Sequence, residues 1–173
     1  MREGVVLVLG GARSGKSAYA ERLVTESGLT PVYVATAEAG DAEMAARIAE
    51  HRARRGAGWT TVEAPDRLEQ ILAREAGAGR ALLVDCLTLW LSNIMLAGAD
   101  AEARCRALAD AAPRLPGLVV FVSNEVGLGL VPDTPLGRRF RDAQGRLNQA
   151  MAAVAAQVVF MAAGLPVVLK GKS

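Results

Sequence analysis

The sequence predicts an α/β protein with a central, mostly parallel sheet. Short apolar runs rich in β-branched residues recur along the chain, and segments with helical spacing of apolar residues separate them. The runs are apolar throughout rather than alternating, which is typical of strands that helices cover on both faces. We therefore expect a sheet of about six or seven strands. The length suits one domain, covering residues 1–173.

The first run, VVLVLGG, is a fully apolar strand, and the other elements follow it in order. Strands are expected at 5–11, 31–37, 59–65, 80–85 and 117–126, with one or two closing strands over 158–170. Helices are expected at 16–27, 41–55, 66–76, 86–97, 100–112 and 136–156. Asp41 and Asp66 could cap two of these helices, because an aspartate accepts hydrogen bonds from the free amide groups at a helix start. Gly56 is expected to end the second helix.

Composition and charge argue against several classes of protein. The 51% hydrophobic and 22% charged residues are typical of a globular chain. A net charge of +2 and only 4% aromatic residues argue against a nucleic-acid partner. Stretches 82–99 and 150–169 approach the length of a membrane span. Polar residues interrupt the first stretch, and Gly164 and Pro166 break the second, so we expect no membrane span.

The cysteines and the N-terminus bear on the compartment. Cys86 and Cys105 do not have the spacing of metal ligands, and we interpret them as reduced thiols. The N-terminal apolar run is too short for a signal peptide. Both observations favour a cytoplasmic protein.

A phosphate-binding loop follows the first strand. The segment GGARSGKS fits the pattern G-x-x-x-x-G-K-[ST] and opens the first helix. Its glycines let backbone amides point at phosphate oxygens, and the helix start adds positive potential. Lys16 is expected to reach the β- and γ-phosphates, and Ser17 to bind Mg²⁺. The residues expected to contact the nucleotide here are Gly10, Gly11, Ala12, Arg13, Ser14, Gly15, Lys16 and Ser17.

Asp85 is a second candidate for the metal. It ends the hydrophobic strand 80–85, where an aspartate of a P-loop protein holds Mg²⁺ directly or through water. A strand-terminal aspartate can instead cap the helix that follows. The phosphate loop makes us favour the metal role. Loop and aspartate together refine the predicted fold to a P-loop NTPase-like (RecA-like) three-layer fold.

Segments beyond the phosphate loop carry a resemblance to a known family. Besides GGARSGKS, they are YVATA, DAEMAARIAEHRARRGAGW, TVEAP, LLVDCLTLWLSN, FVSNEVGLGLVP and GRRFRDAQGRLNQ, spanning nearly the whole chain. In these segments the chain resembles the bifunctional adenosylcobinamide kinase/adenosylcobinamide-phosphate guanylyltransferase family of cobalamin biosynthesis. The segment that contains His51 and the segment SNEVGLGLVP are more specific to this family than the phosphate loop is. Ala37, where serine is also found, is a small departure that does not touch chemistry.

The resemblance implies two reactions on a corrinoid. ATP or GTP first phosphorylates the aminopropanol hydroxyl of adenosylcobinamide. GTP then donates GMP to adenosylcobinamide-phosphate, which releases pyrophosphate and gives adenosylcobinamide-GDP. Family members make this transfer through a covalent GMP–histidine, which carries over onto His51, the one histidine of the chain. The resemblance also implies a homo-oligomer built on trimers.

His51 has a structural interpretation as well. On a helix it shares a stripe with Met44, Ile48 and Arg55, so it could be a half-buried residue at the edge of the core. A nucleophilic histidine must be neutral, and nearby arginines disfavour the imidazolium form. Arginines also neutralise phosphate charge. Arg47 is expected on the same side of the helix as His51. Together with the resemblance, this makes us favour His51 as the nucleophile.

Further contacts with the nucleotide are expected from the resemblance. They come from Ala35, Thr36 and Ala37 at the end of a strand, and from Arg52, Ala53, Arg54 and Arg55 after the histidine. Glu63 could accept hydrogen bonds from guanine N1–H and N2–H, or be an ordinary surface residue. Asn124 and Glu125 end a strand at the edge where α/β sheets bind ligands, so we expect a structural or substrate-positioning role. Four arginines could meet the cobinamide phosphate or a neighbouring subunit: Arg138, Arg139, Arg141 and Arg146.

Other functions remain open at this point. The chain could be a small-molecule kinase without nucleotidyl transfer, in which case His51 is structural. It could also be a nucleotide-switched binding module or a RecA-like ATPase. Since a phosphate loop presents a γ-phosphate and His51 needs an α-phosphate, one site used in two poses or a movement of helix 41–56 would be required.

Overall fold

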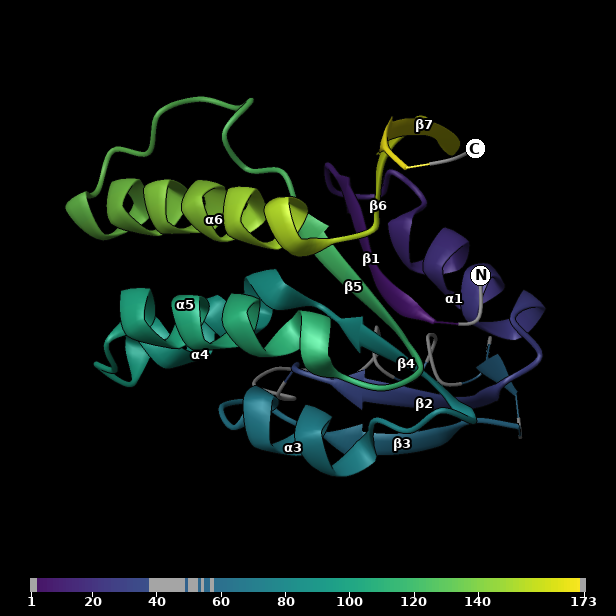
Figure 1. The fold of residues 1–173 in the computed structure, drawn as a ribbon. Helices are drawn as coiled ribbons and strands as arrows, with labels where there is room; N and C mark the ends of the chain where they lie inside the picture. Colours follow the sequence, from purple (N-terminus) through teal and green to yellow (C-terminus); the bar gives the residue numbers. More distant parts are fainter. Residues whose placement is uncertain (1–2, 38–48, 50–52, 54, 57, 172–173) are drawn as a thin grey trace.

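The computed structural model describes residues 3–37, 49, 53, 55–56 and 58–171 (Figure 1). The strands are β1 (Gly4–Gly10), β2 (Thr30–Ala35), β3 (Thr60–Glu63), β4 (Arg80–Asp85), β5 (Leu118–Asn124), β6 (Gln157–Ala162) and β7 (Leu165–Lys170). The helices are α1 (Lys16–Glu26), α3 (Leu68–Glu75), α4 (Leu87–Leu96), α5 (Ala101–Ala111), a 3₁₀ turn η1 (Ala112–Arg114) and α6 (Pro135–Val154).

The strands form one seven-stranded sheet in the order β3-β2-β4-β5-β1-β6-β7. All neighbouring pairs are parallel except β6 with β7. Among the described helices, α1 covers one face, and α3, α4, α5 and α6 cover the other (Figure 1). The predicted three-layer P-loop fold with a mostly parallel sheet is therefore confirmed.

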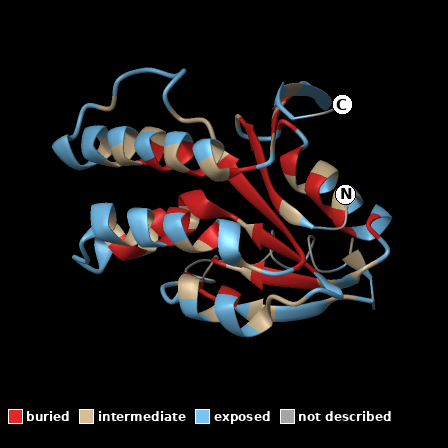
Figure 2. Ribbon diagram, viewed as in Figure 1, coloured by how far each residue is buried: buried red, intermediate tan, exposed pale blue. Residues whose placement is uncertain are grey.

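Burial on both faces explains the continuous apolar strands. In β1, Val6 and Val8 pack in the cluster beneath α1, and Val5, Leu7 and Leu9 pack in the cluster on the opposite face. Successive side chains of a strand point to opposite faces, so a strand covered on both sides must be apolar at every position. Figure 2 shows the buried residues along the central strands and the inward faces of the helices.

The predicted element order holds, and the closing segment becomes two strands. Antiparallel β6 and β7 are joined by a turn in which Ala163 and Gly164 have φ of 50° and 81°. Helix 41–55 and its cap Asp41 fall mostly outside the described residues. The described positions 49, 53 and 55 are helical. Gly56 has φ 72° and is no longer helical, so the predicted helix end is confirmed.

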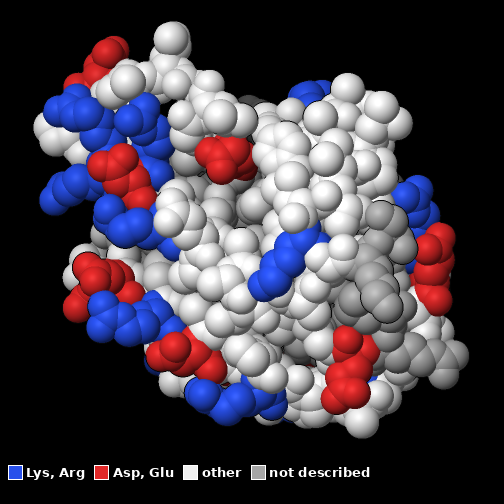
Figure 3. Space-filling view, turned by 45° about the horizontal axis from the view of Figure 1, so that its top comes forward, with Lys and Arg blue, Asp and Glu red and all other residues white. Residues whose placement is uncertain are grey.

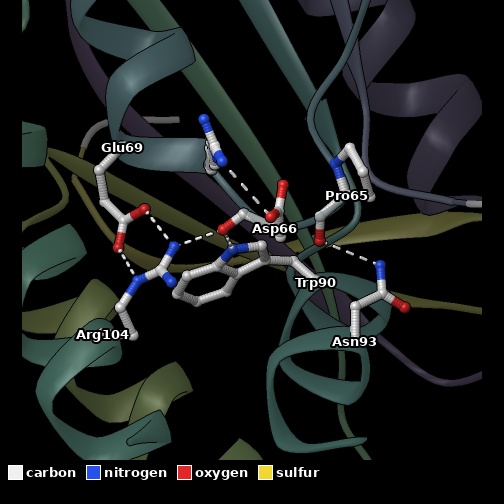
Figure 4. A network of polar contacts seen from close by, with 7 residues as sticks. Pro65, Asp66, Glu69, Trp90, Asn93 and Arg104 are labelled. Carbon is white, nitrogen blue, oxygen red and sulfur yellow. Dashed lines mark hydrogen bonds and ion pairs between the residues drawn. The ribbon is translucent and has the colours of Figure 1, made fainter. Parts of the chain in front are cut away.

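The predicted cap at Asp66 is wrong. Helix α3 begins at Leu68 with Arg67 in the capping position, and no side chain caps it. The Asp66 carbonyl instead accepts hydrogen bonds from Trp90 Nε1 at 3.3 Å and from the Arg104 guanidinium (Figure 4). Contacts with two other helices thus fix this turn.

Arg104 ties α5 to α3. Its Nε and Nη2 each donate to one carboxylate oxygen of Glu69 at 2.8 Å (Figure 4). Such a two-pronged pair is geometrically specific.

No helix in the described part of the chain is long and apolar enough to cross a membrane. Stretch 82–99 forms most of β4 and all of α4. Stretch 150–169 forms the end of α6, then β6 and most of β7.

Candidate nucleotide site

The phosphate loop lies between the end of β1 and the start of α1. Gly10 has φ 151°, and a Cβ built there would lie 2.5 Å from the Met161 carbonyl oxygen of the neighbouring strand β6. Only glycine therefore fits at this position. Gly15 stands at the start of α1 with φ 94°. The loop is also held to the β6–β7 turn, because Gly164 N donates to Ser14 O at 3.1 Å.

Lys16 is buried against this loop. Its Nζ donates to the carbonyl oxygen of Gly11 at 2.5 Å and lies 3.5 Å from Ser14 Oγ. Burial lowers the pKa of Lys16, while the nearby Asp85 acts in the opposite direction. The Lys16 ammonium group thus lies inside the loop within electrostatic reach of the strand-terminal aspartate. Ser17 follows, half-buried in the first turn of α1.

The six parallel strands, β1 to β6, end at the same edge of the sheet. Parallel registers pair Gly10 with Asn124, Asp85 with Val122, and Ala35 with both Asp85 and Glu63. The phosphate loop, Asp85 and Glu63 therefore share the carboxyl edge, where ligands of open α/β sheets bind. Glu63 is exposed there, and Ala35 is half-buried.

Asp85 does not cap the helix that follows. Cys86 occupies the capping position of α4, and no side chain accepts a hydrogen bond there. Asp85 Oδ2 instead accepts a hydrogen bond from the Tyr33 hydroxyl at 3.3 Å. The capping alternative for Asp85 is thereby excluded.

Thr36 fixes the backbone beside Asp85. Its hydroxyl donates to Cys86 O and accepts from Cys86 N, each at 2.7 Å, and the residue is fully buried. Thr36 O accepts from Asn93 Nδ2 at 2.9 Å, and the same amide group donates to Pro65 O at 3.0 Å (Figure 4). Thr36 was predicted to contact the nucleotide. In the structure its hydroxyl joins the end of β2 to the end of β4. Ala37 follows, half-buried.

The end of β5 is held from two sides. Thr88 Oγ1 accepts from Asn124 N at 2.8 Å, and Asn148 Nδ2 donates to Asn124 O at 3.1 Å. Glu125 N donates to Gly10 O at 3.0 Å. The backbone of Asn124 and Glu125 thus helps to position the start of the phosphate loop, as the structural interpretation of these residues expects.

The histidine segment is described only in part. His51, Arg52 and Arg54 lie outside the described residues, and Ala53 is exposed. The Arg55 side chain is 3% exposed, and its guanidinium carbon lies 3.3 Å from the centre of the Tyr33 ring. Within the described ranges, no group of three His, Cys, Asp or Glu side chains could hold a metal ion.

Tyr33 is the site residue that sequence reasoning missed. It pairs with Leu83 in the β2–β4 register, which places its side chain on the face that Asp85 shares two residues further on. The sequence does show a tyrosine two residues before the end of a predicted parallel strand. This position indicates a contact with Asp85 only once β2 is known to lie beside β4.

The four arginines predicted to meet the cobinamide phosphate or a neighbouring subunit lie on α6, far along the chain from the phosphate loop. Arg138 donates to the carbonyl oxygens of Pro132 and Asp133, and Arg141 pairs with Asp142 at 4.0 Å. Figure 3 shows charged side chains gathered at the left of the molecule, where α6 begins, and a largely uncharged centre of that face.

A glycine-rich loop from the first strand to a helix, with an aspartate ending a strand of the same edge, defines a P-loop nucleotide-binding protein. The family model for cobinamide kinase/cobinamide phosphate guanyltransferase matches residues 6–169. The chain belongs to this family. The predicted family and the predicted class of enzyme, a bifunctional kinase and guanylyltransferase, are confirmed.

Curated relatives match along nearly their whole length. The bifunctional adenosylcobalamin biosynthesis protein CobP of Pseudomonas aeruginosa is 55% identical over 168 residues, covering 96% of this chain and 97% of the relative. The bifunctional adenosylcobalamin biosynthesis protein CobU of Escherichia coli is 38% identical over 181 residues, covering 96% and 99%.

Solved structures share the fold at low identity. The flagellar accessory protein FlaH of Methanocaldococcus jannaschii has a TM-score of 0.56 at 12% identity, over 98% of this chain and 79% of that chain. The P4 protein of bacteriophage phi6, in complex with ADP, has a TM-score of 0.53 at 16% identity. The match to the P4 protein covers 95% of this chain but only 54% of the P4 chain.

Proposed function

We propose that this chain phosphorylates the aminopropanol hydroxyl of adenosylcobinamide and then transfers GMP from GTP to the resulting phosphate. The observation that carries the proposal is the phosphate loop beside Asp85 at one sheet edge, in a chain whose family match spans residues 6–169. Adenosylcobinamide, its phosphate, ATP and GTP are then the substrates.

The kinase step is assigned to the loop and the strand-terminal aspartate. Backbone amides from Gly10 to Ser17 would bind the triphosphate, and Lys16 would leave the Gly11 carbonyl for the phosphate oxygens. The substrate hydroxyl attacks the γ-phosphorus, the bond to the β-phosphate oxygen breaks, and the nucleoside diphosphate leaves.

The residues at the site fit a magnesium ion. Asp85 offers a carboxylate and Ser17 a hydroxyl, and Mg²⁺ takes oxygen ligands together with phosphate oxygens and water. Ser17 lies in the first turn of α1, directly after the loop, and the charge of Asp85 counteracts the lowering of the pKa of the loop residue Lys16 by burial. Bound there, Mg²⁺ would neutralise the charge that develops on the β- and γ-phosphates.

The guanylyl step is assigned to His51. Its neutral imidazole would attack the α-phosphorus of GTP, and pyrophosphate would leave. The phosphate of adenosylcobinamide-phosphate would then attack the same phosphorus and release the histidine. Contacts with the guanine nucleotide are proposed for Ala35, Thr36, Ala37, Arg52, Ala53, Arg54, Arg55 and Glu63. Of these, Glu63 is exposed at the edge, where it could accept from guanine.

The assembly is proposed to be a homo-oligomer built on trimers. In support, large apolar side chains stand exposed on the loop after β5, with Leu128 at 81% and Leu130 at 96% exposure. Patches of this kind commonly mark contact sites. We further propose one domain over residues 1–173 acting in the cytoplasm, where both triphosphates are supplied.

The experiment that tests this function incubates the protein with adenosylcobinamide, GTP and Mg²⁺ and follows the corrinoid by mass spectrometry. The phosphorylated corrinoid should form first and adenosylcobinamide-GDP second. Lys16→Ala should form neither product from adenosylcobinamide. A wild-type protein that binds GTP but modifies no corrinoid would contradict the proposal.

A further inference from the structure

Tyr33 connects a predicted metal ligand to a buried arginine. Its hydroxyl donates to Asp85 Oδ2 at 3.3 Å, and Arg55 stacks on its ring at 3.3 Å from the ring centre. Trp59 meets the same ring edge-on, with 6.5 Å between the centroids and 75° between the planes. Tyr33 itself is buried. Three side chains, those of Asp85, Arg55 and Trp59, thus hold one phenol in place.

The Tyr33 hydroxyl is the donor in this hydrogen bond, because the carboxylate of Asp85 can only accept. A phenylalanine would fill the same apolar space, so packing alone does not explain the hydroxyl.

Arg55 also contacts the Tyr33 ring. Its side chain is almost completely buried, and its Nη1 lies 4.0 Å from Glu21 Oε1 of α1. A guanidinium this close to a ring face is attracted by the electrons of the ring. Arg55 thereby helps to hold the ring in place.

We propose that Tyr33 is a positioning residue for the kinase step, whose hydroxyl holds the Asp85 carboxylate in the orientation that receives Mg²⁺. Fixing one oxygen restricts rotation of the carboxylate plane, so less ordering is needed when the metal binds. Arg55 fixes the ring that carries the hydroxyl. This inference rests on the proposed kinase function and on the metal role of Asp85.

The test compares two variants that each lose a single hydroxyl. Tyr33→Phe keeps the ring for Arg55 and Trp59 and removes the donor. Tyr19→Phe is the matched control, since the chain has two tyrosines and Tyr19 packs against Arg22 on α1. The probe is Mn²⁺, measured by electron paramagnetic resonance with a saturating non-hydrolysable GTP analogue.

Tyr33→Phe should bind Mn²⁺ about tenfold more weakly, and Tyr19→Phe like wild type, since hydrogen bonds to charged groups contribute at this level. Affinity for the analogue without metal should stay unchanged. In the kinase assay, kcat should fall and the half-saturating Mg²⁺ concentration should rise, with KM for adenosylcobinamide unchanged. Excess Mg²⁺ should restore part of the rate. Wild-type Mn²⁺ affinity in a folded Tyr33→Phe protein would overturn the proposal.

A second measurement remains if Tyr33→Phe does not fold. Wild-type protein labelled with 3-fluorotyrosine should give two fluorine resonances, assigned with Tyr19→Phe. Asp85→Asn and the addition of Mg²⁺ with nucleotide should each shift the Tyr33 resonance and leave that of Tyr19 in place. An unmoved Tyr33 resonance would overturn the proposal. Because metal binding needs no corrinoid, these results are independent of the corrinoid assay, in which a failure of the proposed function would appear.

Discussion

Thr36→Val removes the hydroxyl that joins the ends of β2 and β4 while keeping the shape of the side chain. The hydroxyl makes two buried hydrogen bonds of 2.7 Å, one to each polar backbone group of Cys86. Valine would leave Cys86 N without that partner in a fully buried position, whereas Cys86 O keeps the hydrogen bond from Trp90 N at 3.2 Å. An unsatisfied buried group costs about 1–3 kcal/mol and the lost hydrogen bond to Cys86 O about 1 kcal/mol, so we expect a loss of about 2–4 kcal/mol in the free energy of unfolding.

The assay is urea unfolding followed by circular dichroism, with Thr36→Ser as the matched control. Serine keeps the hydroxyl and loses one buried methyl group, so it should cost only about 1 kcal/mol. Thr36→Val should also weaken binding of nucleotide with Mg²⁺, because Asp85 directly precedes the released Cys86. A valine variant within about 0.5 kcal/mol of wild type, or a serine variant as unstable as valine, would refute the reasoning.

Two further changes test the loop and the surface charges. Gly10→Ala should lower stability by about 1–3 kcal/mol and abolish nucleotide binding, because its Cβ would lie 2.5 Å from Met161 O. Gly11→Ala, with no atom within 4 Å of its Cβ, should match wild type in urea unfolding. Hydrogen bonds from Arg74 and Arg80 lower the pKa of Glu75 in the folded protein. Its contribution to the free energy of unfolding is therefore present above the pKa of the unfolded state, and it is lost as the pH falls through the pKa of the folded state. Glu75→Gln should cost below about 1 kcal/mol near neutral pH and nothing in strong acid; equal losses at both would contradict this.

Local patterns predicted the fold and the phosphate loop because both depend on short-range sequence. Strand 5–11 and the loop after it can be read from consecutive residues, since burial on both faces requires unbroken apolar runs. Asp85 was found in the same way, as an acid that ends such a run.

The contacts that sequence reasoning missed join residues far apart in the chain. The Tyr33 hydroxyl and Asp85 are separated by 52 positions, and Thr36 and Cys86 by 50. These pairings follow from β2 lying beside β4, and no local pattern gives that order. Asp66 failed as a cap for a related reason, because Trp90 and Arg104 from later helices hold its carbonyl.

The measurement that tests the central claim most directly uses GTP radiolabelled at the α-phosphate. Wild type and His51→Ala are incubated with it and Mg²⁺, then separated on a denaturing gel. The account predicts an acid-labile, base-stable label on wild type that is absent from His51→Ala and is discharged by adenosylcobinamide-phosphate. A wild-type protein that binds GTP and takes no label, or an equally labelled His51→Ala, would contradict the account.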